Sequence, residues 1–194
     1  VKNLKEKKPF LKIKKEEIYK FIFNKFGFKN SSIITNKNYF NKLSSKYKIF
    51  KIKETNSMLQ TIKESLIFLN NQKNFFLLSC DCFGTLQSNI FKKFISANKP
   101  DVVLFAFSIS KLQRKLSNSH TTIKINSSNK ITSINVKNFS KDLKEFGHAG
   151  FFWIKDSSVF KYLNEYIKKS KLGRELLLDD YFKYLFEKRL FKVK

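Results

Sequence analysis

Short apolar runs typical of buried strands alternate in this chain with segments whose apolar residues recur at helical spacing. Residues 75–79 and 102–108 are strand-like runs, whereas residues 18–26 place their apolar side chains on one helical face. Such alternation predicts an α/β fold in which helices cross over a sheet. We expect one domain over residues 1–194, built on a mixed, mostly parallel sheet with helices on both faces.

Local patterns predict the remaining elements. The strands that we expect to share the sheet lie near residues 32–35, 75–79, 102–108 and 149–154. A hairpin is expected from residues 121–125 and 131–134, around a turn at 127–130. Further helices are expected at 57–69, 159–167 and 180–188, and a short strand at 190–193. The helix at 57–69 begins with a capping box, in which Ser57 and Gln60 bind free backbone N–H groups.

The net charge of +25 is carried almost wholly by Lys, because Arg occurs only at Arg114, Arg174 and Arg189. A strongly basic chain suggests a polyanionic partner, but these Lys residues are spread along the whole chain. Abundant Lys, Asn, Ile and Phe together are typical of an AT-rich genome, and proteins that recognise nucleic-acid bases usually rely on Arg. We therefore expect no dedicated nucleic-acid partner, and keep a basic nucleic-acid-binding protein as the second alternative function.

The apolar runs and the cysteines limit the class of protein further. No run approaches the roughly 20 apolar residues of a membrane span. Cys80 and Cys82 are too close in sequence to staple a domain, so we expect no disulfide framework and a reducing, cytoplasmic compartment. With His120 and His148 they are zinc-ligand types, but the usual paired spacing is lacking. Buried thiols are the better interpretation of both cysteines.

Acidic residues stand where two apolar runs end. Asp81 follows the strand at 75–79 and precedes Gly84, while Asp179 and Asp180 follow a later run. Ligands of open α/β sheets lie at the carboxyl ends of strands, and carboxylates suit a hard cation such as Mg²⁺. Capping of the next helix is an equal alternative for Asp81. For Asp179 and Asp180 the local pattern alone favours capping.

A third segment places small residues before an aromatic strand. Gly147, Ala149 and Gly150 surround His148, and the chain then continues into three aromatic residues. Small residues allow a ligand to approach the backbone closely. The alternative is a tight turn that happens to contain a polar His.

The order of these motifs resembles the sugar-phosphate nucleotidyltransferases with a GT-A-like fold, over nearly the whole chain. Lys8 lies in a Lys-Pro segment similar to the one that follows that family's phosphate-binding loop. Residues 54–59 resemble the segment that lies near the base, and residues 80–84 the strand-end metal site. The other similar segments are 134–137 for the Glu-Lys motif, 147–152 for the sugar-side turn and 174–180 for the closing helix with a second metal-binding Asp.

The resemblance implies a three-layer, Rossmann-like domain for nucleotide-sugar biosynthesis. In this family a sugar 1-phosphate and a nucleoside triphosphate give a nucleotide sugar and pyrophosphate. The resemblance implies that Asp81 and Asp180 hold Mg²⁺, and that Lys137, the third catalytic residue, faces the sugar phosphate. The implied substrate-binding residues are Lys8, Asn56, Ser57, Gly84, His148, Ala149 and Gly150. Assembly into a homo-oligomer stays open.

The chain also departs from the family pattern. Val136 stands where the family has Glu, and His148 where it has Asn. The family's glycine-rich loop is not found and would lie before Val1. We therefore expect an N-terminally truncated domain that is inactive as these 194 residues alone. A non-catalytic or degenerate homologue, acting as a binding or regulatory module, is the first alternative function.

Overall fold

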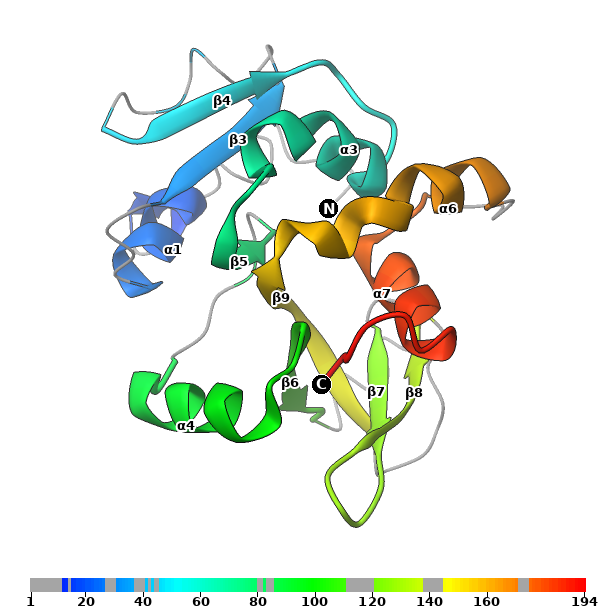
Figure 1. Ribbon diagram of the computed structural model, residues 1–194. Coiled ribbons are helices and arrows are strands. Elements are labelled where there is room, and N and C mark those ends of the chain that lie inside the picture. Colours follow the sequence, from blue (N-terminus) through cyan, green and yellow to red (C-terminus); the bar gives the residue numbers. More distant parts are fainter. Residues whose placement is uncertain are drawn as a thin grey trace.

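The computed structural model describes residues 12–13, 15–26, 31–36, 41, 43, 46–79, 82, 86–110, 121–137, 145–170 and 175–194 (Figure 1). The elements follow in chain order: β1 (Lys12–Ile13), β2 (Glu16–Glu17), α1 (Ile18–Phe26), β3 (Ser32–Asn36), β4 (Lys48–Ile52), α3 (Met58–Leu69), β5 (Lys73–Leu78), α4 (Ser88–Asn98), β6 (Val102–Ser108), β7 (Thr122–Ile125), β8 (Ile131–Asn135), β9 (Glu145–Asp156), the 3-10 helix η2 (Ser157–Tyr162), α6 (Leu163–Lys169) and α7 (Leu178–Glu187). The alternation of strands and helices confirms the predicted α/β class.

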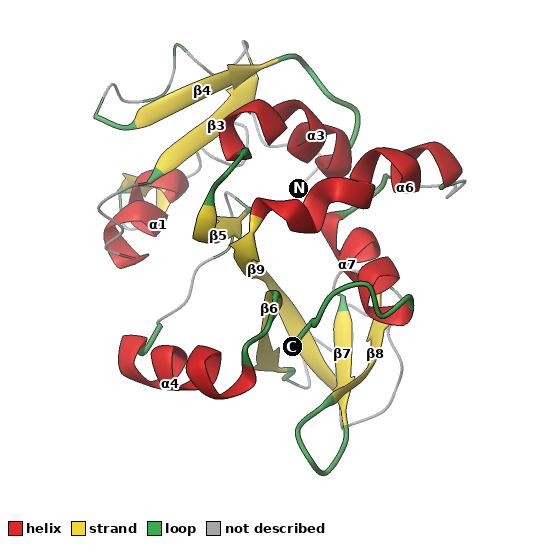
Figure 2. Ribbon diagram, viewed as in Figure 1, coloured by secondary structure: helices red, strands yellow, loops and turns green. Residues whose placement is uncertain are grey.

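Strand β9 is the centre of a five-stranded sheet (Figure 2). β6 runs antiparallel along one edge of β9, with Val102 opposite Ile154 and Phe107 opposite Gly147. β5 and β7 share the other edge, and β8 pairs with β7. Every pairing between these five strands is antiparallel, so the expected mostly parallel arrangement is corrected. The β7–β8 hairpin reverses the chain, and β9 therefore enters the sheet against the direction of β5 and β6.

β3 and β4 form a separate, parallel two-stranded sheet, with Ile33 opposite Ile49 and Thr35 opposite Lys51. Within the described residues neither strand is hydrogen-bonded to β5. The prediction that residues 32–35 share the sheet of β5, β6 and β9 was therefore wrong. Strand-type residues indicate an extended segment, but they do not specify which strand lies beside it. β4 itself was not predicted.

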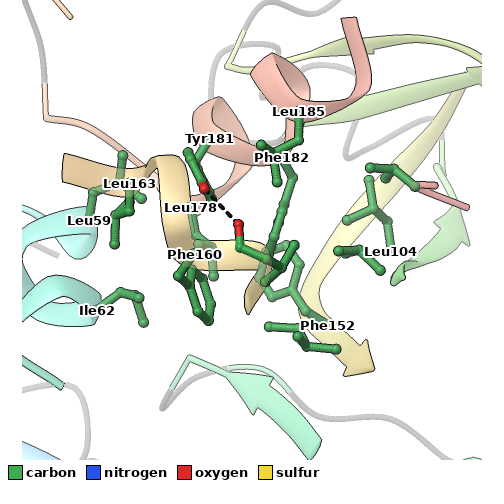
Figure 3. Close-up of a cluster of buried hydrophobic side chains, with 14 of the residues drawn as sticks. Leu59, Ile62, Leu104, Phe152, Phe160, Leu163, Leu178, Tyr181, Phe182 and Leu185 are labelled. Carbon is green, nitrogen blue, oxygen red and sulfur yellow. Dashed lines mark hydrogen bonds between the residues drawn. The ribbon is translucent and has the colours of Figure 1, made fainter. Parts of the chain in front are cut away.

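Helices cover both faces of the five-stranded sheet, as predicted, and give it three layers. On one face, α3, η2, α6 and α7 bury the main hydrophobic core against Leu104 of β6 and Phe152 and Ile154 of β9. Figure 3 shows this cluster, with the side chains of α7 at its centre. The Tyr181 hydroxyl donates a hydrogen bond to the carbonyl oxygen of Val159 at 2.7 Å, so the buried phenol has a partner.

The opposite face of the sheet carries an aromatic layer. Successive strand residues point to opposite faces, so Phe151 and Trp153 of β9 lie on this side. The Phe151 ring stacks on the rings of Phe76 and Phe105, which are tilted against each other. Helix α4 covers them through Phe91, whose ring centroid lies 5.5 Å from that of Phe76 and 5.9 Å from that of Trp153. This helix, which lies apart from the others in Figure 1, was not predicted from the sequence.

Several local predictions hold. The Ser57 hydroxyl oxygen accepts a hydrogen bond from the Gln60 backbone N–H at 3.2 Å and caps α3. The Gln60 side chain in turn accepts from the backbone N–H of Asn56 at 3.0 Å, one residue before the expected partner. The hairpin of β7 and β8 forms where it was predicted. The expected strand at 190–193 is reduced to a parallel bridge between Val193 and Val102.

Two isoleucines of α3 test how far the core stabilises the fold. Ile62 is 5% exposed and Ile67 is 76% exposed, on the same helix. We expect Ile62→Ala to lower the free energy of unfolding by about 2–5 kcal/mol, because it opens a cavity. The matched change Ile67→Ala should stay within about 0.5 kcal/mol of the unchanged protein. Urea unfolding followed by circular dichroism measures both, and equal losses would contradict the described packing.

Candidate functional site

The segment that leads into α7, residues 175–180, is hydrogen-bonded to the start of α3. A Glu175 carboxylate oxygen accepts from the backbone N–H of Met58 at 3.2 Å. The carbonyl oxygen of Leu176 accepts from the backbone N–H of Leu59 at 3.3 Å. The first turn of α3 therefore lies beside the residues that precede α7, although 117 residues separate Met58 from Glu175.

The same segment also contacts residues 147–150 of β9, which we call the glycine segment. His148 Nδ1 lies 2.6 Å from an Asp179 carboxylate oxygen. Its other ring nitrogen, Nε2, lies 3.3 Å from the carbonyl oxygen of Phe151. The His148 side chain is 2% exposed and that of Asp179 is 13% exposed. The backbone N–H of His148 donates to the carbonyl oxygen of Thr121 at 2.8 Å, so the pair is held from three elements.

The surroundings of Asp179 favour its ionised form. Burial alone would raise the pKa of the Asp179 carboxyl, but hydrogen bonds from His148 and Thr121 and the charge of His148 lower it further than burial raises it. The resulting pKa lies below the ordinary value of 3.8. A carboxylate in that state accepts hydrogen bonds and donates none.

The Asp180 side chain has a different hydrogen-bond partner from that of Asp179. Its side chain accepts a hydrogen bond from the backbone N–H of Leu177 at 2.9 Å, and the residue is 6% exposed. The four N–H groups that begin a helix lack partners within it, and acidic residues in the first turn also interact favourably with the helix dipole. The capping interpretation that the local pattern favoured for Asp180 is therefore what its described contact shows.

Gly150 brings the end of β5 against the glycine segment. Its φ of +66° is a conformation that side chains rarely adopt, and a Cβ there would lie 2.5 Å from the sulfur of Cys82. The carbonyl oxygen of Gly150 also accepts from the backbone N–H of Ser79 at 3.4 Å. Residues on both sides of position 81 thus contact Gly150, and only glycine fits there without strain.

The other predicted site residues lie at the rim of these contacts or outside the described residues. Asn56 and Ser57 form the start of α3, where Ser57 acts as the helix cap. Lys137 is exposed and lies two residues after the end of β8, with a φ of 47°. Ala149 is half-buried within the glycine segment. The predictions for Lys8, Asp81 and Gly84 fall on residues outside the described part of the chain.

The pairing of His148 with Asp179 was not predicted. Asp179 lies in the acidic segment that follows the apolar run, but the family resemblance implied the metal-binding role for Asp180. The two partners are 31 residues apart in sequence, and no motif spacing links them. A helical register for α7 separates the two acids: one carboxylate turns back to cap the helix, and the other reaches β9.

In the parts of the chain that the structure describes, no three His, Cys, Asp or Glu side chains gather closely enough to hold a metal ion. None of the described helices is both long and apolar enough to cross a membrane.

Neither a protein-family model nor a curated protein matches the sequence. Solved structures do resemble it. A nucleoside-diphosphate-sugar pyrophosphorylase from Vibrio cholerae RC9 matches with a TM-score of 0.74 and 14% identity, over 99% of this chain and 84% of that one. An inositol-1-phosphate CTP transferase from T. maritima matches with a TM-score of 0.67 and 15% identity, over 96% and 75% of the two chains.

A UDP-glucose pyrophosphorylase, solved with UDP-glucose, matches with a TM-score of 0.71 and 12% identity, over 93% of this chain and 79% of that one. The chain therefore has the fold of the sugar-phosphate nucleotidyltransferases, which confirms the fold that the sequence resemblance implied. At these identities the comparison establishes the fold and leaves the reaction to be proposed.

Gly150 provides a test of the junction between β5 and β9. We expect Gly150→Ala to lower the free energy of unfolding by about 1–3 kcal/mol, because alanine is strained at this φ, with a further loss from the contact with Cys82. Adding Cys82→Ala removes the sulfur. The double variant should regain the stability lost to that contact but not the stability lost to strain at this φ. Urea unfolding of the single and double variants measures this, and a Gly150→Ala protein as stable as the parent would contradict the described backbone.

The lowered pKa of Asp179 predicts a pH-dependent contribution to stability. A group whose pKa is lower in the folded state stabilises the fold above its unfolded pKa, about 3.9, and loses that contribution as the pH falls through the folded value. The difference in unfolding free energy between the parent and Asp179→Asn should therefore be largest above about pH 4 and shrink below it. Thermal unfolding from about pH 3 to 6 measures it. The exposed Glu187→Gln, on the same helix, is the control and should leave the pH profile unchanged.

Proposed function

We propose that this chain acts in an enzyme that joins a sugar 1-phosphate to a nucleoside triphosphate and releases pyrophosphate. The observation that carries the proposal is the junction at Gly150, within the fold of the sugar-phosphate nucleotidyltransferases. There the end of β5, whose strand-end acid Asp81 was predicted to hold the metal, meets the glycine segment, which was predicted to line the sugar. The segment that the resemblance assigned to the metal and the segment that it assigned to the sugar are thus adjacent.

The proposed reaction is an in-line displacement at phosphorus. A phosphate oxygen of the sugar phosphate forms a bond to the α-phosphorus of the triphosphate, the bond from that phosphorus to the bridging oxygen breaks, and pyrophosphate leaves with the electron pair. Such a reaction depends on orientation and charge neutralisation rather than on a protein nucleophile. The role of the chain is to hold both phosphates in line.

Lys137 is the proposed cation for the sugar phosphate. It follows β8 at the end where Asn135 pairs with Thr122, and the neighbouring Thr121 accepts the backbone N–H of His148. Because Thr122 pairs with both Asn135 and Gly147, the end of β8 that precedes Lys137 lies level with the start of the glycine segment. An exposed ammonium at that place is able to reach a phosphate bound beside the glycine segment, as a point charge.

Mg²⁺ is the proposed cofactor, and the described residues supply only part of a site for it. Carboxylate oxygens are the right ligand type, but Asp180 is buried and its carboxylate binds the N–H of Leu177. To serve as a ligand, Asp180 would have to leave this cap. Asp81, with the substrate phosphates, is the better proposed ligand.

The assay that tests the function is pyrophosphate release by the full-length protein, with Mg²⁺ and panels of nucleoside triphosphates and sugar 1-phosphates. Release that needs both substrates supports the proposal. Saturable binding of either substrate without any release would favour the non-catalytic binding module. If no pair of substrates gives either binding or release, both the enzyme and the binding-module proposals are overturned.

The Lys137 variant sharpens this test. We expect Lys137→Ala to raise KM for the sugar phosphate by about 10- to 100-fold, because a charge-assisted hydrogen bond of about 1.5–3 kcal/mol is lost. KM for the nucleotide should change far less. Lys130→Ala, which removes an exposed Lys from the hairpin turn, is the matched control and should leave both constants unchanged. An unchanged KM for the sugar phosphate in Lys137→Ala would show that Lys137 does not bind the sugar phosphate.

A further inference from the structure

We infer that Asp179 is a positioning residue, which holds the His148 ring so that it fastens the glycine segment to α7 and leaves ligand recognition there to backbone groups. The ligand part of this inference rests on the proposed function. The contact between Asp179 and His148 does not depend on it.

Both polar atoms of the imidazole are committed to the protein. The atom facing Nδ1 is a carboxylate oxygen of Asp179, at 2.6 Å, and the atom facing Nε2 is the carbonyl oxygen of Phe151, at 3.3 Å. Ionised carboxylates and carbonyl oxygens only accept hydrogen bonds, so either oxygen can accept from the ring nitrogen that faces it when that nitrogen carries a proton. Neither nitrogen is directed at open space, where a sugar hydroxyl would need it.

The ring is also enclosed. The His148 side chain is 2% exposed, and its ring centroid lies 4.6 Å from that of Phe152, a residue of the main core. The backbone N–H of the same residue is bonded to Thr121. Turning the ring toward a ligand would break the bond to Asp179 and leave a buried carboxylate without one of its donors, which is costly. The ring therefore has one orientation, and Asp179 sets it.

This orientation matters because the glycine segment is fastened at both ends. His148 ties its first half to α7 through Asp179, and Gly150 ties its second half to the end of β5 through Ser79 and Cys82. Ala149, between them, is half-buried. The groups that we expect to meet a ligand are the small side chain of Ala149 and the peptide group between Ala149 and Gly150, which a sugar can approach closely because they carry little bulk.

The test of the contact is nuclear magnetic resonance of the ring N–H protons. The chain has two histidines, so His120→Gln leaves the His148 ring signals alone in the spectrum. A ring N–H bonded to a buried carboxylate should resonate at low field and be protected from exchange with water. Asp179→Ala should abolish that signal, and Asp179→Asn, which keeps an acceptor oxygen, should retain a weaker one. Asp156→Asn changes the acid at the other end of β9, which caps η2, and should leave the signal unchanged.

An unprotected ring N–H in the parent, or a signal that persists in Asp179→Ala, overturns the inference. If Asp179→Ala fails to fold, the ring signals of the parent and of Asp179→Asn still test the inference. In the functional arm, titration with a sugar 1-phosphate should shift the backbone amides of Ala149 and Gly150 but not the His148 ring signals. A large shift of the ring signals would make His148 itself the ligand-binding group and overturn the positioning role.

Kinetics separate this inference from the proposed function. Asp179→Asn should lower kcat/KM for the sugar phosphate by about 10- to 100-fold, because a small displacement of a binding segment has an effect of that size. Adding His148→Gln to Asp179→Asn should cause little further loss, since the two residues act as one unit. Additive losses would overturn the inference. If no variant and no parent protein turns over, the proposed function fails, and the ring signals still decide the role of Asp179.

Discussion

Strand β9 hydrogen-bonds to β6 on one edge and to β5 and β7 on the other, and the positions of most other elements follow from this arrangement. Its 12 residues alternate between the two faces of the sheet. One set of side chains enters the core under α3, α6 and α7, and the other forms the aromatic layer under α4. The same strand carries the glycine segment, so the candidate site is part of the most constrained strand of the sheet.

A polar pair lies beside the hydrophobic core at this point of β9. Burying an ionised carboxylate is costly unless a charged or hydrogen-bonding partner compensates. Asp179 receives that compensation from His148 and Thr121, and its lowered pKa is the result. The net stabilisation from the pair is therefore small, and its main effect is to fix the distance between β9 and the first turn of α7. A fixed distance is what the proposed nucleotidyl transfer would require of the groups around its substrates.

Much of the fold could be predicted from local sequence, because helix periodicity, the capping box at Ser57 and the β7–β8 hairpin depend on neighbouring residues. Strand partners could not. The separate pairing of β3 with β4 and the antiparallel entry of β9 depend on contacts between distant segments. Helix α4 was missed because it buries little: Phe91 joins the aromatic layer, while Ile90 on the same helix is exposed.

The candidate site divides in the same way. The sequence by itself determined which segments carry it: an apolar strand that ends near Asp81, the small residues around His148, and the acids before α7. Only the tertiary structure shows which of Asp179 and Asp180 caps the helix and which binds His148. Asp180 caps its own helix, while Asp179 reaches a histidine 31 residues earlier in the chain. Adjacent acids look alike in a sequence, but in a helix they point about 100° apart, so only the packing of α7 against β9 distinguishes them.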